Sequence, residues 1–280
     1  MSMKDGRVRV RDIEIHYQIT DFTDPWTKPQ TVLLHHGFAR NLDLWYAWVP
    51  LLCRDFRVVT FDSRGCGDST VPPEGYRYSV DELANDAVAL MDALGLDRVH
   101  WGAEASGGIV GIHAAIRFPQ RIASLTLCNT PVKIPQATHD IFVAEEVRKF
   151  GTGYWARKSA PNRFDTSKLS EGYLEWSIAQ HDRTRPHAAI AIHEMLQTAD
   201  SWPVLPDLKV PVLVLAGDGS KIATLDEMEK MVKRIPDAKL VVFKGYGQGI
   251  AFSNSEACAA AMRDFIRVLP ADCGCRQNMQ

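Results

Sequence analysis

The chain has 280 residues, of which 46% are hydrophobic and 24% charged, and its formal net charge is −2. This length accommodates one α/β domain with an insertion, and the composition is typical of a globular protein with a sizeable core. The 32 basic and 34 acidic residues are mixed along the chain, so the sequence indicates no nucleic-acid partner. No run approaches the roughly 18 apolar residues of a membrane helix, and we expect no membrane partner.

Targeting and cofactor signals are weak throughout the chain. Residues 1–12 are charged and lack the apolar stretch of a signal peptide, so we expect a cytoplasmic protein. Residues 271–280 are polar and are expected to form a flexible tail; Cys273 and Cys275 could alternatively form a metal or redox pair there. Neither a GxGxxG motif nor a phosphate loop occurs, so we expect no cofactor and no metal.

The first half of the chain alternates short β-branched runs with amphipathic helical stretches. This pattern predicts a mostly parallel sheet with helices on both faces. Strands are expected over residues 8–11, 13–19, 31–36, 56–61, 98–103 and 122–129. Ser79 can cap a helix over residues 80–94, which Gly95 ends, and a second helix is expected over residues 107–118.

From residue 132 to residue 203 no strand-like run occurs, and the helical segments are rich in Trp, Tyr and His. The alternation then resumes with strands expected over 209–216 and 240–243 and helices over 225–235 and 255–268. We therefore expect an α/β core of about eight strands formed by residues 1–131 and 204–270. Residues 132–203 are expected to form a helical cap over the site.

Three segments carry a family resemblance, each placed after an expected strand. They are His36-Gly37-Phe38, the run Asp-Ser-Arg-Gly-Cys-Gly-Asp-Ser at 62–69, and the run Ala-Glu-Ala-Ser-Gly-Gly at 103–108. In this order and spacing they make the chain similar to the α/β-hydrolase family, in particular to its lid-bearing esterases, lactonases and C–C bond hydrolases. The resemblance covers residues 8–268 and implies the α/β-hydrolase fold, with a pocket at the carboxyl ends of the strands.

The family's nucleophile elbow has the pattern small-x-nucleophile-x-Gly, and two registers fit it here. If the pattern is anchored on the glycines at 107–108, Ala105 occupies the nucleophile position, and Glu104 packs beside the elbow. If it is anchored on Gly102, Glu104 occupies that position and could act as a general base or form an ester. We adopt the first register because it keeps both glycines; Ser106 is then a small residue at a crowded turn.

The positions that the resemblance implies for the base and the acid also carry unusual residues. The loop after the last strand holds Gln248 where the family has its histidine, and all nine histidines lie at or before His193. The acid position, three residues after Gly217, is Ser220, with Asp218 close by. A serine-based acyl transfer needs a hydroxyl, a base and a group that orients the base, so this route is not expected.

Other site residues follow from the same resemblance. The backbone N–H groups of Phe38 and Ser106 are expected to form an oxyanion hole. His36, Arg40 and Tyr246 are expected to bind substrate; Arg40 could reach a carboxylate bidentately, or lie solvated on its loop. The expected cap contains His139, His181, His187 and His193. They are expected to be polar cap residues, because their spacing is not that of metal ligands. A histidine beside Asp140 or Asp182 could alternatively serve as a base.

These observations favour an enzyme with a non-standard site that acts on a small lipophilic molecule. Carbonyl chemistry of the lyase, isomerase or cyclase type is expected. Two alternatives remain: an ester, lactone or C–C bond hydrolase disabled by substitution, and a non-catalytic ligand-binding protein. The chain could also form a homodimer.

Overall fold

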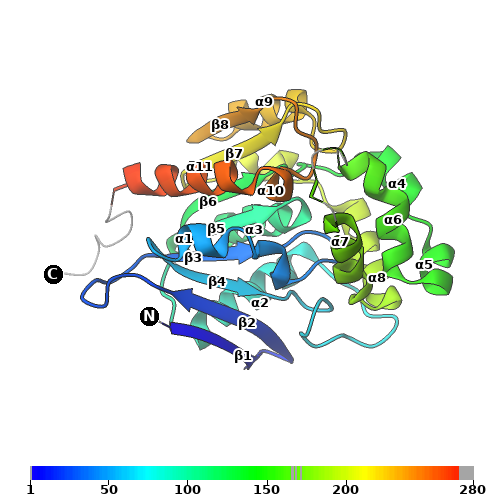
Figure 1. Ribbon diagram of the computed structural model, residues 1–280, viewed down its shortest axis with the longest axis horizontal. Coiled ribbons are helices and arrows are strands. Elements are labelled where there is room, and N and C mark those ends of the chain that lie inside the picture. Colours follow the sequence, from blue (N-terminus) through cyan, green and yellow to red (C-terminus); the bar gives the residue numbers. More distant parts are fainter. Residues whose placement is uncertain (1, 165–166, 168, 171, 271–280) are drawn as a thin grey trace.

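The computed structural model describes residues 2–164, 167, 169–170 and 172–270 (Figure 1). The tail predicted at residues 271–280, including Cys273 and Cys275, lies outside the described part of the chain.

The centre of the molecule is one eight-stranded sheet, in the order β1-β2-β4-β3-β5-β6-β7-β8. The strands are β1 (Ser2–Val10), β2 (Ile13–Asp21), β3 (Thr31–His35), β4 (Arg57–Phe61), β5 (Val99–Glu104), β6 (Ile122–Cys128), β7 (Val212–Gly217) and β8 (Ala238–Phe243). β2 pairs antiparallel with β1 and β4, and the remaining strands are parallel. This is the α/β-hydrolase fold expected from the sequence.

The chain order places a topological switch point next to β3. From β3 the chain moves to β4 on one side and then returns to β5 on the other side. In open parallel sheets, ligands bind at the carboxyl ends of strands where the order reverses in this way. We therefore expect a binding site at the loops after β3 and β5.

Helices cover both faces of the sheet because successive strand residues point to opposite sides. Leu33 packs into one core with residues of α2 and α3, whereas Val32 and Leu34 pack into a second core with residues of α1 and α11. The sheet helices are α1 (Val49–Leu52), α2 (Val80–Ala93), α3 (Ser106–Arg117), α9 (Leu225–Arg234), α10 (Ile250–Ser253) and α11 (Ser255–Val268). Short 3-10 turns lie at Leu42–Trp45, Pro119–Arg121 and Trp202–Asp207.

The segment after β6 is helical and lies apart from the helices that cover the sheet. It contains α4 (Gln136–Ile141), α5 (Ala144–Phe150), α6 (Thr152–Arg163), α7 (Tyr173–Asp182) and α8 (Pro186–Thr198). Figure 1 shows these green helices grouped together at one side of the molecule. We refer to residues 132–203 as the helical segment.

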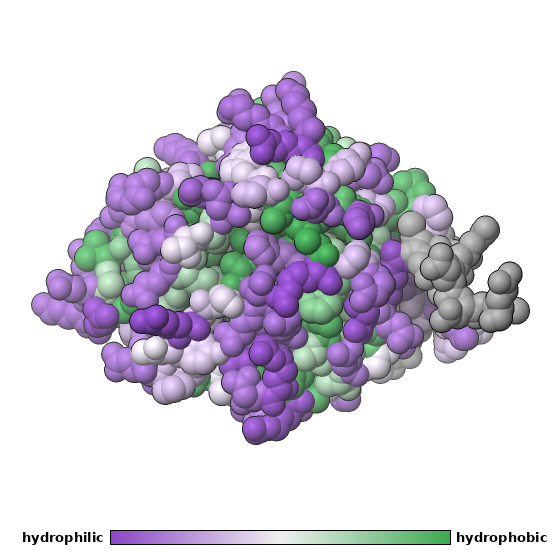
Figure 2. Space-filling model, turned by 180° about the vertical axis from the view of Figure 1, so that it is seen from behind, coloured by the Kyte–Doolittle hydropathy of each residue, from purple (hydrophilic) through white to green (hydrophobic). Residues whose placement is uncertain are grey.

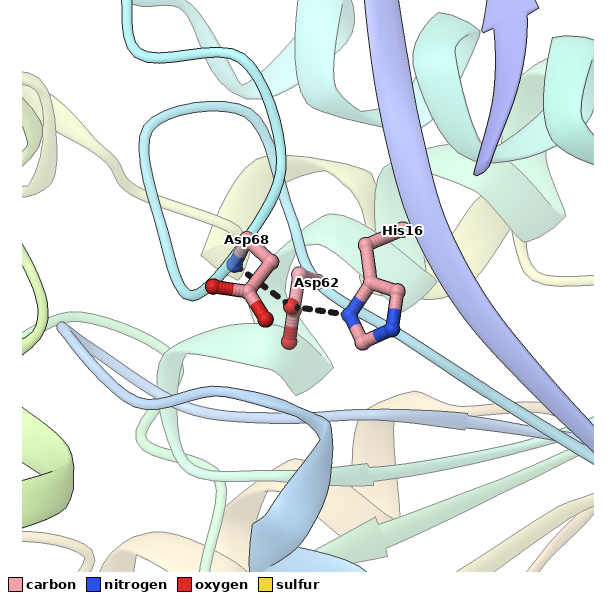
Figure 3. A group of neighbouring side chains, drawn as sticks. All are labelled: His16, Asp62 and Asp68. Carbon is pink, nitrogen blue, oxygen red and sulfur yellow. Dashed lines mark hydrogen bonds and ion pairs between the residues drawn. The ribbon is translucent and has the colours of Figure 1, made fainter. Parts of the chain in front are cut away.

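The loop after β4 is fixed by one buried carboxylate, Asp62. Its Oδ1 accepts a hydrogen bond from the N–H of Leu42 at 2.7 Å, and its Oδ2 accepts one from the N–H of Asp68 at 2.8 Å. His16 Nδ1 lies 2.8 Å from the same Oδ2, and Figure 3 shows Asp62 between the His16 ring and the backbone nitrogen of Asp68. A side chain on Gly67 would collide with this carboxylate, with its Cβ only 2.2 Å from Oδ2.

His16, Asp62 and Asp68 also have the separation of metal ligands, with ligand atoms within 4.8 Å of one another. However, both oxygens of Asp62 already accept hydrogen bonds, and Asp68 pairs with Arg183 at 3.0 Å. The hydrogen bond that His16 donates to Asp62 raises the pKa of His16, which favours the charged imidazolium. We interpret the group as a structural network that joins the loops after β3 and β4.

The outer surface mixes polar and apolar residues. On the face in Figure 2, hydrophilic side chains are interspersed with smaller hydrophobic areas. Within the described residues, no helix combines the length and the apolar character needed to cross a bilayer. The predicted homodimer stays a prediction.

Candidate functional site

The sharpest turn of the backbone at the switch point is at Ala105, between β5 and α3. Ala105 has φ 47° and ψ −121°, a conformation that L-residues rarely adopt, whereas Glu104 still belongs to the strand and Ser106 begins the helix. The turn is tight because the neighbouring loop packs against it: a Cβ on Gly107 would lie 2.4 Å from the carbonyl oxygen of His36. The chain thus keeps a strained strand-to-helix turn that presents only a methyl group.

The strain at Ala105 makes a prediction about stability. Replacing Ala105 by glycine should raise the free energy of unfolding by about 0.5–1 kcal/mol, because glycine adopts a positive φ without steric cost and this outweighs its larger conformational entropy. Ala89→Gly, within helix α2, is the matched control and should lower the free energy by about 1 kcal/mol. Urea denaturation followed by circular dichroism measures both; equal destabilisation by the two substitutions would contradict the strain.

Gln248 is buried beside this turn and is held by three hydrogen bonds. Its Oε1 accepts from the hydroxyl of Ser220 at 2.6 Å and from the N–H of Ala223 at 3.1 Å. Its Nε2 donates to the carbonyl of Asn129 at 2.6 Å. An amide offers two acceptor and two donor positions, so one N–H of Gln248 remains available. Asp218, the carboxylate close to the expected acid position, accepts a hydrogen bond from the N–H of Gly245 at 2.6 Å.

Asn129, at the end of β6, fixes the loop that carries Gln248. Its Nδ2 donates to the carbonyls of Gly247 at 2.7 Å and Gln248 at 2.6 Å, and its Oδ1 accepts from the N–H of Gly217 at 2.9 Å. Asn129 itself has φ 42°, which asparagine tolerates better than most residues. This role has no local sequence signal, because the three partners lie 88 to 119 residues away.

Two backbone N–H groups near the turn, those of Phe38 and Ser106, are expected to form the oxyanion hole. Ser106 is the first residue of α3, and helices leave their first N–H groups without an intrahelical acceptor. Among the backbone bonds of the described loops and turns, none uses the N–H of Phe38 or of Ser106 as donor. Both residues line the pocket described next.

A pocket with an empty volume of about 640 Å³, partly open to solvent, lies between this turn and the helical segment. Its lining combines four kinds of residue: those of the turn and its loops (Phe38, Arg40, Glu104, Ala105, Ser106, Gln248), apolar residues (Pro131, Ile134, Phe142, Trp155, Leu196, Ile222), histidines (His139, His193), and Thr138 and Arg163.

Glu104 is the carboxylate of this pocket, and it is buried. Its side chain packs against Gly37, where a Cβ would lie 2.1 Å from Oε2. Burial raises the pKa of Glu104, whereas the charges of Arg40 and Arg163 and the N–H of Gly37 act in the opposite direction. Glu104 therefore belongs to the pocket although it precedes the turn residue in the chain.

His139 and His193 form a pair that the sequence did not predict. Nδ1 of His139 lies 3.0 Å from Nε2 of His193, although the two residues are 54 positions apart. The His193 ring stacks on Phe142, with ring centroids 4.0 Å apart. Burial lowers the pKa of His193 to about 4 and also lowers that of His139, so both rings are neutral near pH 7.

Other residues expected at the site lie outside the lining of this pocket. The ring of His36 is buried: its Nδ1 lies 2.8 Å from the carbonyl of Gly37, and its Nε2 accepts from the N–H of Ser63 at 3.0 Å. Tyr246 is half-buried and packs against the core that contains α11. His181 is buried within the helical segment, and His187 contacts the carbonyl of Pro72.

Comparisons with known proteins agree with this architecture. The model of the α/β-hydrolase-fold family matches residues 30–254, so the chain belongs to this family. A 3-oxoadipate enol-lactonase from Acinetobacter baylyi is 27% identical over 215 residues, which cover 76% of this chain and 80% of that protein. A protein from Agrobacterium fabrum named "Putative carbamate hydrolase RutD" is 32% identical over 271 residues, 92% of this chain and 99% of that protein.

Solved structures give the same result for the fold. The enol-lactonase from Burkholderia xenovorans superposes with a TM-score of 0.85 at 25% identity, covering 94% of this chain and 100% of that one. A thermophilic esterase from Thermogutta terrifontis superposes with a TM-score of 0.83 at 29% identity, covering 94% and 98%. The chain thus shares its fold with hydrolases of small molecules.

Proposed function

We propose that this chain is a small-molecule enzyme of the α/β-hydrolase family that acts on a carbonyl compound without a serine nucleophile. The observation that carries the proposal is the alanine at the strained turn. Ala105 occupies the nucleophile position, Gln248 the base position and Ser220 the acid position. The methyl group cannot attack a carbonyl, and the amide of Gln248 has no useful basicity near neutral pH.

Carbonyl polarisation is the chemistry that the remaining groups support. The N–H groups of Phe38 and Ser106 form an oxyanion hole, which stabilises negative charge that develops on a carbonyl oxygen. Glu104 accepts a proton from a carbon next to that carbonyl, a role for which a buried carboxylate with a raised pKa is suited. These roles describe a lyase, isomerase or cyclase, with residues 132–203 as the cap over a small lipophilic substrate.

The substrate-binding residues divide into two groups in this proposal. Arg40 contacts substrate directly from the pocket wall. His36 and Tyr246 are positioning residues, which hold the loops after β3 and β8 from outside the pocket lining.

The names of the relatives support a small-molecule substrate for this chain. They include proteins named as an enol-lactonase and an esterase, which act on carbonyl groups of small molecules.

A disabled hydrolase or a ligand-binding protein is the second candidate. The three hydrogen bonds that tie Gln248 to Ser220, Ala223 and Asn129 favour it, because they leave this side chain little freedom to take part in chemistry.

Turnover of aryl esters and lactones tests the proposal. The unmodified chain should hydrolyse 4-nitrophenyl acetate no faster than a control protein. The triple variant Ala105→Ser, Gln248→His, Ser220→Asp should gain activity if the scaffold retains a hydrolase pocket; inertness of both proteins would favour a pocket adapted to other chemistry. Hydrolysis by the unmodified chain at enzyme-like rates would contradict the proposal.

Exchange of substrate protons with solvent distinguishes the two candidate functions, an enzyme and a ligand-binding protein. The unmodified chain should accelerate deuterium incorporation next to the ketone of 3-benzoylpropionate in D₂O, as observed by proton NMR. Glu104→Gln should abolish the acceleration, since the amide cannot accept the proton. Binding of the ketone without accelerated exchange would favour the ligand-binding protein.

A further inference from the structure

Two arginines meet in the pocket at one end of its lining. Arg40 follows β3 and is only 3% exposed, and its guanidinium lies 4.2 Å from the ring centroid of Phe252. Arg163 ends α6, and its guanidinium lies 4.7 Å from the ring centroid of Trp155. Both guanidiniums also lie against Phe164, at 5.7 Å and 5.0 Å from its ring centroid, so one aromatic ring contacts both cations.

Neither arginine has a carboxylate partner among the described residues. No ion pair within 4.0 Å involves Arg40 or Arg163, although eighteen such contacts occur elsewhere in that part of the chain. The acceptors of Arg163 are neutral: Ser159 Oγ at 3.0 Å, the carbonyl of Ala156 at 2.8 Å, and Nε2 of His181 at 3.1 Å. Burial and the charge of Arg40 lower the pKa of Arg163 to about 9.

Among its described lining residues, the pocket therefore holds more positive than negative charge. Two guanidiniums face one carboxylate, Glu104, and burial disfavours the ionised form of that carboxylate. A buried charge without a partner is costly, so such groups are normally paired. An anion that enters the pocket would supply the missing partner.

The unused hydrogen-bond donors of Arg40 also indicate that an anionic partner is missing from the pocket. Nη1 of Arg40 is buried and makes no hydrogen bond to the described residues. The hydroxyl of Tyr173 is also buried and lies near the same guanidinium, but their contact does not reach normal hydrogen-bond geometry. A guanidinium presents a planar fork of donors that matches the two oxygens of a carboxylate.

We propose that the pocket binds a small carboxylate with an apolar or aromatic body. Its carboxylate group lies between Arg40 and Arg163, and its body lies against Phe38, Phe142 and Leu196. When Glu104 is ionised, the two guanidiniums leave an excess of one positive charge; a carboxylate balances this excess, whereas a phosphate dianion exceeds it. The inference rests on the proposed function only in that it assigns the same pocket to the substrate.

Equilibrium binding tests this assignment without any need for turnover. Isothermal titration calorimetry would compare 3-phenylpropionate, its uncharged amide and 2-phenylethylphosphonate with the unmodified chain. The carboxylate should bind at least ten-fold more tightly than the amide and more tightly than the phosphonate. Equal affinity for carboxylate and amide would overturn the proposal, and tighter binding of the phosphonate would overturn the choice of carboxylate.

Variants identify the groups responsible. Arg40→Gln and Arg163→Gln should each weaken carboxylate binding at least ten-fold and leave amide binding within about two-fold. Arg183→Gln is the matched control, because Arg183 belongs to the helical segment but pairs with Asp43 and Asp68 outside the pocket, and it should change neither affinity. Circular dichroism would verify that each variant is folded. Unchanged carboxylate affinity in both folded pocket variants would overturn the proposal.

Discussion

Replacement of Asn129 by alanine is expected to lower the free energy of unfolding by about 3–5 kcal/mol. The substitution leaves three backbone groups without their partner, the carbonyls of Gly247 and Gln248 and the N–H of Gly217, and each buried unsatisfied group costs about 1–3 kcal/mol. It also places alanine at φ 42°, where asparagine is better tolerated.

Urea denaturation followed by circular dichroism measures this loss. Asn162→Ala is the matched control, because Asn162 is an exposed residue of α6 and its replacement should change the free energy by less than about 0.5 kcal/mol. Asn129→Ala should also weaken ligand binding in the pocket, since the loop that carries Gln248 loses its anchor. A loss of stability below 1 kcal/mol would show that this loop is held by other contacts.

Replacement of Asp62 by alanine should have a similar effect, a loss of about 3–5 kcal/mol. Asp62 is fully buried, and its removal leaves the N–H groups of Leu42 and Asp68 and Nδ1 of His16 without their acceptor. Asp68→Ala is the matched control on the same loop. The Asp68 side chain is exposed, and within the described part of the chain its ion pair is with Arg183 at the surface, so its loss should cost less than about 1 kcal/mol.

The stability difference caused by Asp62→Ala should also depend on pH. Asp62 raises the pKa of His16 in the folded chain, so the stabilisation from this pair is complete below the unfolded-state pKa of about 6.5. It is lost as the pH rises through the pKa of folded His16. Chemical denaturation should therefore give a larger difference between the two proteins at about pH 6 than at about pH 9; a constant difference would contradict the charged pair.

The sequence predicted the strands and helices of the core well, because the alternation of β-branched runs and amphipathic stretches is strong there. The first strand is longer than expected, Ser2–Val10 rather than residues 8–11. Its polar residues are exposed at the sheet edge, where antiparallel pairing with β2 holds the backbone without apolar burial. The seventh strand begins at Val212 rather than at residue 209, since Pro211 has no N–H to donate to a ladder.

The candidate site was predicted only in part. The family pattern identifies Ala105, Gln248 and Ser220 one at a time, and the structure brings Ser220 and Gln248 into a 2.6 Å hydrogen bond. Arg163 was missed, because the sequence does not reveal which residue of a helical segment faces the pocket. The pairing of His139 with His193 depends on tertiary packing of two separate helices and has no local signal.

The measurement that tests the central claim most directly is labelling with a fluorophosphonate, a reagent that forms a covalent bond with activated serines. Intact-mass spectrometry should show no adduct on the folded unmodified chain, because Ala105 offers no hydroxyl and Gln248 cannot activate one. The triple variant Ala105→Ser, Gln248→His, Ser220→Asp provides the positive control, with one adduct expected at residue 105. An adduct on the folded unmodified chain that maps to Ser106 or another residue of the pocket, and that disappears on denaturation, would contradict the claim that this protein works without a serine nucleophile.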